Sequence, residues 1–193
     1  MDAMPVLTTP SIVKTGRTHL MDAMPVELSD ELRAWNSQLS SSRKMLGVIE
    51  KRFLELPQGG TAVGSGINAH KHFAKYFAQE MTKLSGNKCK CVPSENFFHE
   101  LSAQDCSVQL SGELRNLAVI LMKISNDLRW MNSGPLSGLS EIELQALQPG
   151  SSIMPGKVNP VIPEAVTMAS ADVIGNDLTI TVAAQAGNFQ LNV

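Results

Sequence analysis

The segment Leu114-Arg-Asn-Leu-Ala-Val-Ile-Leu-Met-Lys-Ile-Ser-Asn-Asp-Leu-Arg-Trp-Met131 decides the fold class of this chain. Its apolar side chains recur at alternating steps of three and four, at positions 114, 117, 121, 124, 128 and 131. This heptad-like spacing places them along one side of a helix, as in helices that pack lengthwise against others. We expect one helix from about Asn96 to Asn132, on the order of 50 Å long. Because isolated helices are only marginally stable in water, other long helices must lie beside it.

Three further segments carry a helical pattern of apolar residues. They predict helices from about Ser29 to Phe53, from about Lys71 to Leu84 and from about Pro163 to Ala186. The last segment is rich in Ala, Val and Thr and nearly uncharged, which indicates that most of its sides are buried. We therefore predict an all-α fold, a bundle of long helices. One chain of 193 residues can hardly cover both long helices, so we expect several copies to associate.

The composition limits the classes of function. Hydrophobic residues make up 43% of the chain and the formal net charge is −2, which gives no electrostatic case for a nucleic-acid or membrane partner. No apolar run reaches the ~18–20 residues that span a bilayer. Three cysteines, an odd number, favour a reducing compartment, so we expect a cytoplasmic protein, or a mitochondrial-matrix protein in a eukaryote. Cys89 and Cys91 lack the second half of a metal site, and no metal is predicted there.

A second informative segment is Gly150-Ser-Ser-Ile-Met-Pro-Gly-Lys-Val-Asn-Pro160. Lys157 supplies a point charge for a carboxylate, and Asn159 supplies a directed hydrogen bond. Ser151 and Ser152 offer a nucleophile or a base. The first turn of the helix that follows aims free N–H groups back at this segment. The mixture indicates a loop that closes over an anion, and the alternative is a plain surface turn between Gly and Pro.

This segment resembles the signature of the fumarase/aspartase superfamily, whose members eliminate or add across the double bond of fumarate. Other blocks resemble the family in the same order along the chain: Gly16-Arg-Thr-His-Leu-Met-Asp-Ala-Met-Pro25, Gly59-Gly-Thr-Ala-Val-Gly-Ser-Gly66, Ile174-Gly-Asn-Asp177 and Gly187-Asn-Phe-Gln-Leu-Asn192. Within the superfamily the chain looks most like class II fumarase, because Thr18-His19-Leu20 carries a histidine where aspartases usually place glutamine. The resemblance implies an irregular lead-in at residues 1–10 and the family's central helical domain at 11–193. The family's N-terminal and C-terminal domains are expected to be absent from this chain.

The resemblance also implies roles for six residues. It implies three catalytic residues, Ser151, His19 and Glu164, and three substrate-binding residues, Thr18, Lys157 and Asn159. Ser151 would remove the proton next to a carboxylate, and His19, paired with Glu164, would protonate the leaving hydroxyl or activate water. This chemistry requires no metal, nucleotide or redox cofactor. Family sites are assembled from three subunits of a tetramer, so we expect a homotetramer that binds a small dicarboxylate.

Three functions remain open from the sequence. The first is reversible hydration of fumarate to L-malate by anti addition and elimination. The second is an aspartate ammonia-lyase, because Val161-Ile-Pro-Glu164 is somewhat aspartase-like. The third is a catalytically silent helical assembly fragment, because the family's N-terminal domain, which supplies further substrate contacts, is expected to be absent from this chain. We expect this chain alone to have little or no activity. In the structural alternative, Glu164 is a first-turn acid beside the helix dipole and Lys157 is a solvated loop lysine.

Overall fold

The computed structural model describes residues 11–150 and 152–192. The expected lead-in at residues 1–10 and the predicted base Ser151 therefore lie outside the described residues. Within the chain, two compact units are distinguished, the first formed by residues up to 42 together with 117–171, and the second by residues 43–116 together with 172–193.

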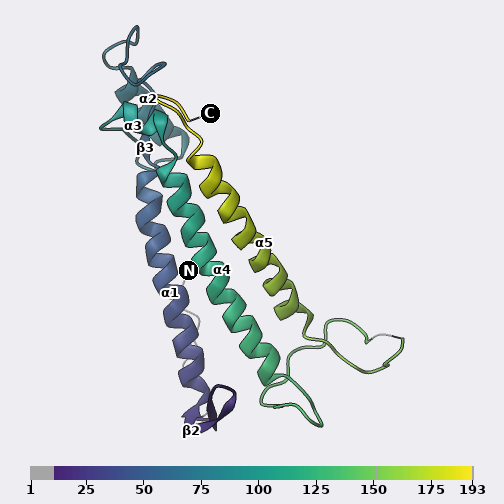
Figure 1. Ribbon diagram of the computed structural model, residues 1–193. Helices are drawn as coiled ribbons and strands as arrows, with labels where there is room; N and C mark the ends of the chain where they lie inside the picture. The colour runs from purple at the N-terminus through teal and green to yellow at the C-terminus, as the bar shows by residue number, and fades with distance from the viewer. Residues whose placement is uncertain (1–10, 151, 193) are drawn as a thin grey trace. The chain divides into compact units, whose positions relative to one another are not determined.

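Long helices dominate the structure, which confirms the all-α prediction (Figure 1). They are α1 (Leu28–Arg52), α4 (Asp105–Met131) and α5 (Val161–Ala184), and shorter helices are α2 (Phe73–Leu84) and α3 (Phe97–Ser102). Two short strands, β3 (Glu55–Leu56) and β4 (Val92–Pro93), pair in parallel in the second unit. Within the described residues, no helix combines the length and the apolar character that crossing a bilayer requires.

The predicted helix from Asn96 to Asn132 is two helices, so that prediction is wrong. The side chain of Asn96 accepts a hydrogen bond from the His99 backbone N–H at 3.2 Å and caps the short helix α3. Ala103 then adopts an extended backbone, with φ −130° and ψ 155°, and α4 begins at Asp105. A local cap and two non-helical residues thus break a segment whose composition favours a continuous helix.

The second departure is a β-hairpin before α1, which no apolar period predicted. Strand β1 (Val13–Thr18) pairs antiparallel with β2 (Met21–Glu27), with a register shift between Thr15 and Arg17. Gly16 lies between them, and a Cβ there would come 2.5 Å from the Met24 carbonyl oxygen. The strands can approach this closely only because the residue is glycine.

Buried positions recur every seven residues on the long helices. The positions in this series are Trp35, Ser42 and Ile49 on α1, Ser111, Ala118 and Ser125 on α4, and Pro163, Ser170 and Asp177 on α5, and Ser29 and Met131 are buried in addition. On α4 these are small residues, whereas most of the predicted leucine seam is only partly covered and Leu114 is exposed. The predicted burial of α5 is also not found in the single chain, where Met168, Leu178 and Val182 are exposed.

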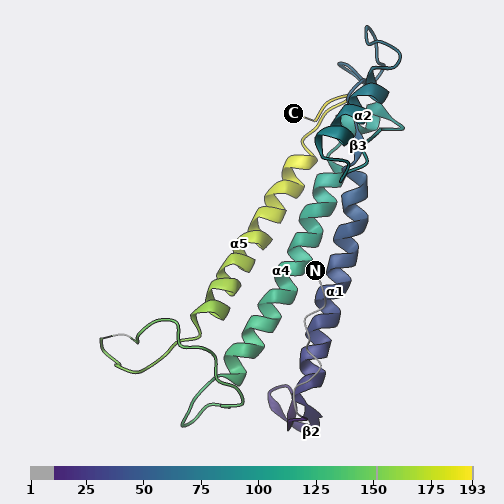
Figure 2. The same cartoon turned by 180° about the vertical axis from the view of Figure 1, so that it is seen from behind.

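In the first unit, the N-terminal half of α1 and the C-terminal half of α4 lie side by side in both views (Figures 1 and 2). The Lys123 ammonium group of α4 lies 5.8 Å from the ring centroid of Trp35 on α1. Leu28, the first residue of α1, donates its backbone N–H to the Ile12 carbonyl at 2.9 Å. The hairpin is therefore tied to the start of α1, and this unit also holds all the described site residues.

Candidate functional site

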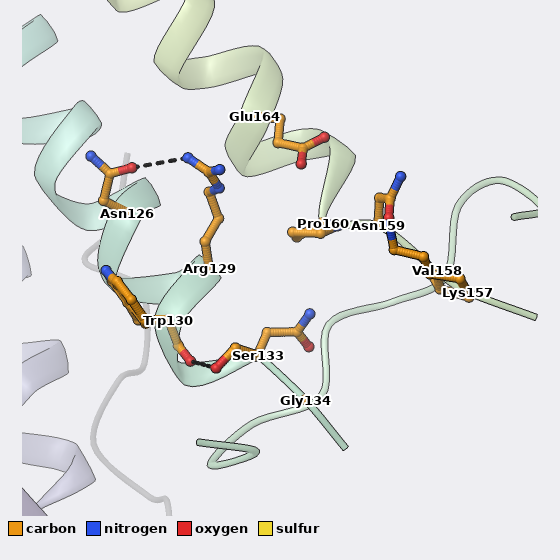
Figure 3. A pocket seen from close by; sticks show the side chains of 11 residues that line it. Asn126, Arg129, Trp130, Ser133, Gly134, Lys157, Val158, Asn159, Pro160 and Glu164 are labelled. Carbon is orange, nitrogen blue, oxygen red and sulfur yellow. Dashed lines mark hydrogen bonds between the residues drawn. The ribbon is translucent and has the colours of Figure 1, made fainter. Parts of the chain in front are cut away.

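A pocket of about 530 Å³ lies where α4 ends and α5 begins (Figure 3). We call it the loop pocket, and its lining is Asn126, Arg129, Trp130, Asn132, Ser133, Gly134, Lys157, Val158, Asn159, Pro160 and Glu164. Three of the predicted site residues, Lys157, Asn159 and Glu164, therefore share one pocket. They come from the glycine-rich loop and from the first turn of α5.

The backbone of this loop closes on itself through its two glycines. A Cβ on Gly150 would come 2.5 Å from the Lys157 carbonyl oxygen and 2.9 Å from that of Met154. Gly156 has a φ of 86°, a left-handed conformation that glycine adopts without strain. The Lys157 N–H donates to the Met154 carbonyl at 3.2 Å. The two glycines thus fix the position of Lys157, which explains the spacing of the sequence motif.

Helix α5 begins at Val161, two residues after Asn159. The Val161 N–H donates to the Asn159 carbonyl at 2.9 Å, and the Glu164 N–H donates to the Pro160 carbonyl at 3.2 Å. The helix N-terminus, with its partial positive charge, therefore borders the loop pocket. Glu164 is half-buried, whereas Lys157 and Asn159 are exposed. The pocket combines a cation, a carboxamide, a helix N-terminus and a carboxylate, which suits an anionic ligand and a proton transfer.

Arg129 adds a second cation that the sequence did not single out. It lies in the last turn of α4, lines the loop pocket and donates to Asn126 Oδ1 at 3.2 Å. In Figure 3 its guanidinium and the Glu164 carboxylate extend from two helix ends into the same space. A basic residue in a last helical turn is expected from the helix dipole alone, so the sequence held no signal for this second role.

His19 occupies the tip of the β-hairpin. It has a φ of 56° and Leu20 has a φ of 61°, so both central residues of this two-residue turn are left-handed. Such turns normally use Asn or Gly, and a non-glycine residue in this conformation costs about 1–3 kcal/mol. Thr18 ends β1, pairs with Met21 and is exposed, as is His19. Strained backbone of this kind is concentrated at functional sites.

His19 lines a different pocket, of about 390 Å³, which we call the hairpin pocket. Its lining is Lys14, Thr15, Arg17, His19, Leu20, Glu31, Lys123, Asp127, Trp130, Met131, Leu139 and Glu141. Trp130 lines both pockets, but in the described part of the chain no hydrogen bond or ion pair joins His19 to Glu164. The pairing of His19 with Glu164 stays a prediction, for an assembly of several chains.

An ion-pair cluster closes one side of the hairpin pocket. Lys14 Nζ lies 2.9 Å from Glu31 Oε2 and 2.6 Å from Glu141 Oε2, and Arg17 donates to Glu141 Oε1. Burial alone would raise the pKa of Glu141, but the adjacent cations of Lys14 and Arg17 outweigh it and hold that pKa below its ordinary value. Burial would lower the pKa of Lys14, but its two carboxylate partners raise it above its ordinary value.

The cysteines provide no metal site in the described structure. Cys89, Cys91 and Cys106 are half-buried free thiols. Across residues 11–150 and 152–192, no three His, Cys, Asp or Glu side chains are grouped so that they could hold a metal ion.

Comparison with known proteins extends these observations. Residues 8–175 match a family described as lyase. The chain belongs to this lyase family. It is 59% identical over 181 residues to a class II fumarate hydratase of Pseudomonas aeruginosa, and 57% identical over 183 residues to a class II fumarate hydratase of Xylella fastidiosa. The resemblance to class II fumarases is thus confirmed.

Solved structures agree with these sequence relatives. A class II fumarase from Schistosoma mansoni superimposes with a TM-score of 0.91 at 38% identity, covering 93% of this chain and 40% of that protein. A Brucella melitensis protein described as fumarate lyase:delta crystallin, bound to cobalt, superimposes with a TM-score of 0.88 at 47% identity, covering 93% of this chain and 39% of that protein.

The chain spans about two fifths of the length of the curated relatives that it matches. The match covers 94% of this chain and 39% of the Pseudomonas protein, and 95% of this chain and 38% of the Xylella protein. The family and the fold of this lyase segment are therefore established over nearly the whole chain.

Proposed function

We propose that this chain forms the central helical domain, residues 11–193, of an enzyme that reversibly hydrates fumarate to L-malate. The observation that carries the proposal is the meeting of Lys157, Asn159 and Glu164 around one pocket at the start of α5. The high identity to proteins named class II fumarate hydratase supports a hydro-lyase over an aspartate ammonia-lyase. The substrate would be a small dicarboxylate.

The difficult step of this reaction is the build-up of charge on a carboxylate. Removing a proton from the neighbouring carbon produces a doubly charged aci-carboxylate, and a fixed donor aimed at it stabilises the transition state by about 2.7–4 kcal/mol. We assign Lys157 and Asn159 to this role, with support from the helix N-terminus beside them. Arg129 lines the same pocket and adds positive charge to it.

Proton transfers need a base and an acid on the two carbons of the substrate. We assign the base to Ser151, whose alkoxide requires stabilisation by nearby N–H groups and Lys157. His19 suits protonation of the leaving hydroxyl or activation of water, because an imidazole ring can both donate and accept a proton. Glu164 would pair with His19 and fix its tautomer, and Thr18 would bind substrate or water.

The proposed enzyme is a homotetramer in which different chains complete each site. Support comes from α5, whose apolar residues Met168, Leu178 and Val182 are exposed in one chain. Further support is that His19 and Glu164 line different pockets within one chain. A cytoplasmic location and the absence of nucleic-acid or membrane partners belong to this proposal.

The test is an assay of the protein expressed from the complete reading frame that contains these residues. Ultraviolet absorbance would follow fumarate formation from L-malate and, separately, from L-aspartate. We expect turnover of L-malate alone, and a loss of at least about 100-fold in Lys157→Met, which removes a charged donor. The matched control is Lys71→Met on the second unit. Turnover of L-aspartate in place of L-malate would overturn the proposal.

A further inference from the structure

The ion-pair cluster of the hairpin pocket has no part in the proposed reaction, and it points to a further function for Glu141. We propose that Glu141 is a positioning residue, which holds the hairpin that carries His19 against the C-terminal end of α4. This inference rests on the proposed function, because it assigns Glu141 an effect on the proton transfer by His19.

The backbone of Glu141 is anchored at the end of α4. Its N–H donates to the Met131 carbonyl at 2.8 Å, and the Ile142 N–H donates to the same oxygen at 3.2 Å. One residue earlier, the Ser140 N–H donates to the Ser133 carbonyl at 2.7 Å. The two bonds to Met131 satisfy the carbonyl group of the last residue of α4, which the helix cannot satisfy internally. The backbone that carries the Glu141 carboxylate is therefore anchored to the last residue of α4.

Each oxygen of that carboxylate receives a cation from strand β1. Oε2 lies 2.6 Å from Lys14 Nζ, and Oε1 accepts a hydrogen bond from Arg17. Side chains three residues apart point to opposite faces of a regular strand. Here the register shift between Thr15 and Arg17 changes the local twist, and both side chains reach the same carboxylate. The register shift in the hairpin thus allows Lys14 and Arg17 to bind one carboxylate.

The two cations depend on Glu141 to different degrees. Lys14 keeps a second carboxylate, Glu31, at 2.9 Å. Arg17 has Asp22 at 4.0 Å, with a side chain that is 86% exposed, so Glu141 is its main partner. Arg17 lies two residues before His19, and the Glu141 side chain is only 13% exposed. Loss of the Glu141 charge would therefore act directly on the strand end that holds His19.

The charges of the hairpin pocket argue against an anion-binding site there. Its three cations, Lys14, Arg17 and Lys123, are each paired with a carboxylate of the same lining. An incoming anion would have to displace one of those carboxylates. A structural contact in which Glu141 holds β1 against the end of α4, which we call the brace, accounts for this balance of charges, and a ligand site does not.

The experiment compares Glu141→Gln with Glu143→Gln, which changes the same charge two residues along the loop. Glu143 is exposed and lines neither pocket. The first readout is the NMR spectrum of histidine-labelled 193-residue chain, with the His19 signal assigned by its loss in His19→Asn. In Glu141→Gln we expect the His19 ring signals to shift or broaden while those of His70 and His72 stay. In Glu143→Gln we expect no change.

The second readout is turnover of L-malate by the protein from the complete reading frame. Glu141→Gln should lower kcat about 10-fold or more, with a smaller change in KM, because misplacing a catalytic group by about 1 Å costs up to about 100-fold. In Glu141→Gln, the acid limb of the profile of kcat against pH should shift. Glu141→Asp, which keeps the charge, should recover part of kcat.

The two readouts separate the two proposals. Absence of turnover in every variant, with His19 signals that still respond to Glu141→Gln, would remove the proposed function and leave the brace. Equal NMR spectra and equal kcat in Glu141→Gln and Glu143→Gln would overturn the brace. If Glu141→Gln does not fold, Arg17→Lys, which keeps the charge but removes the planar fork, should show the same change at smaller amplitude, and no change there would also overturn it.

Discussion

Gly150 lies directly against the backbone of Lys157, so close that a Cβ on Gly150 would come 2.5 Å from the Lys157 carbonyl oxygen. This contact restricts the backbone of Lys157, the residue that carries the cation of the loop pocket. The glycine at the start of the motif is therefore a geometric requirement of the loop, independent of the reaction that the loop serves.

Gly150→Ala should consequently displace Lys157 and lower turnover of L-malate by about 10-fold or more, because catalysis is sensitive to shifts of about 1 Å. The measurement is kcat/KM together with the unfolding midpoint in urea. Gly47→Ala in α1 is the control, because a Cβ built there meets no atom within 4 Å apart from its chain neighbours and the adjacent helix backbone. That helical substitution should stabilise the chain by about 0.5–1 kcal/mol. Unchanged kcat/KM in Gly150→Ala would show that the contact does not position the cation.

A buried carboxylate joins α4 and α5 in the second unit. Asp177 is only 5% exposed in its side chain, and it accepts hydrogen bonds from Ser111 Oγ at 2.7 Å and from Arg115 Nη1 at 2.8 Å. Asp177→Asn removes the charge but keeps the shape, and we expect it to cost about 1–3 kcal/mol of unfolding free energy. Urea unfolding measures this loss. Asp172→Asn, at an exposed position bonded to Asn176, should cost less than about 0.5 kcal/mol. Equal losses in both variants would contradict the role of burial.

The type of the long helices was predictable because a single signal, the spacing of apolar residues, sets it. Helix α1 was expected from Ser29 to Phe53 and is found at Leu28–Arg52. The break before Asp105 was not predictable, since it depends on a cap from Asn96 and on an extended backbone at Ala103 rather than on composition. Local hydrogen bonds to the backbone compete with helix formation in this way.

The site was predictable only where one segment carries it. Lys157, Asn159 and Glu164 lie within eight residues, so their meeting follows from a loop and the first helical turn. Arg129 reaches the same pocket from another helix, and its place follows from tertiary packing. The turn at His19 and Leu20 contains neither Asn nor Gly, the residues from which such turns are predicted. The sequence did not point to Glu141 either, because its two partners lie more than 120 positions away and meet it only through tertiary packing.

The stability of the ion-pair cluster should depend on pH at both ends of the range. The pKa of Glu141 lies below its ordinary value of 4.5, so its contribution is present above that value and is lost as the pH falls through the lowered pKa. The pKa of Lys14 lies above its ordinary value of 10.5, so its contribution is present below that value and is lost as the pH rises through the raised pKa. Between these limits, urea unfolding should give a constant difference in the free energy of unfolding between the unaltered chain and Glu141→Gln. Below pH 4.5 the difference should shrink, and a difference that grows there would contradict the lowered pKa.

His19→Asn separates the chemistry of the imidazole from the conformation of the turn. Asparagine tolerates a positive φ better than most residues, so it should keep the left-handed turn at the hairpin tip. We therefore expect circular dichroism and the unfolding midpoint to stay unchanged while turnover of L-malate falls about 100-fold or more, as for loss of a general acid–base group. His70→Asn provides the matched control, since His70 lies in the second unit, and it should leave turnover unchanged. Equal turnover in the two variants would remove His19 from the proposed reaction and leave its strained turn as a purely structural feature of the hairpin.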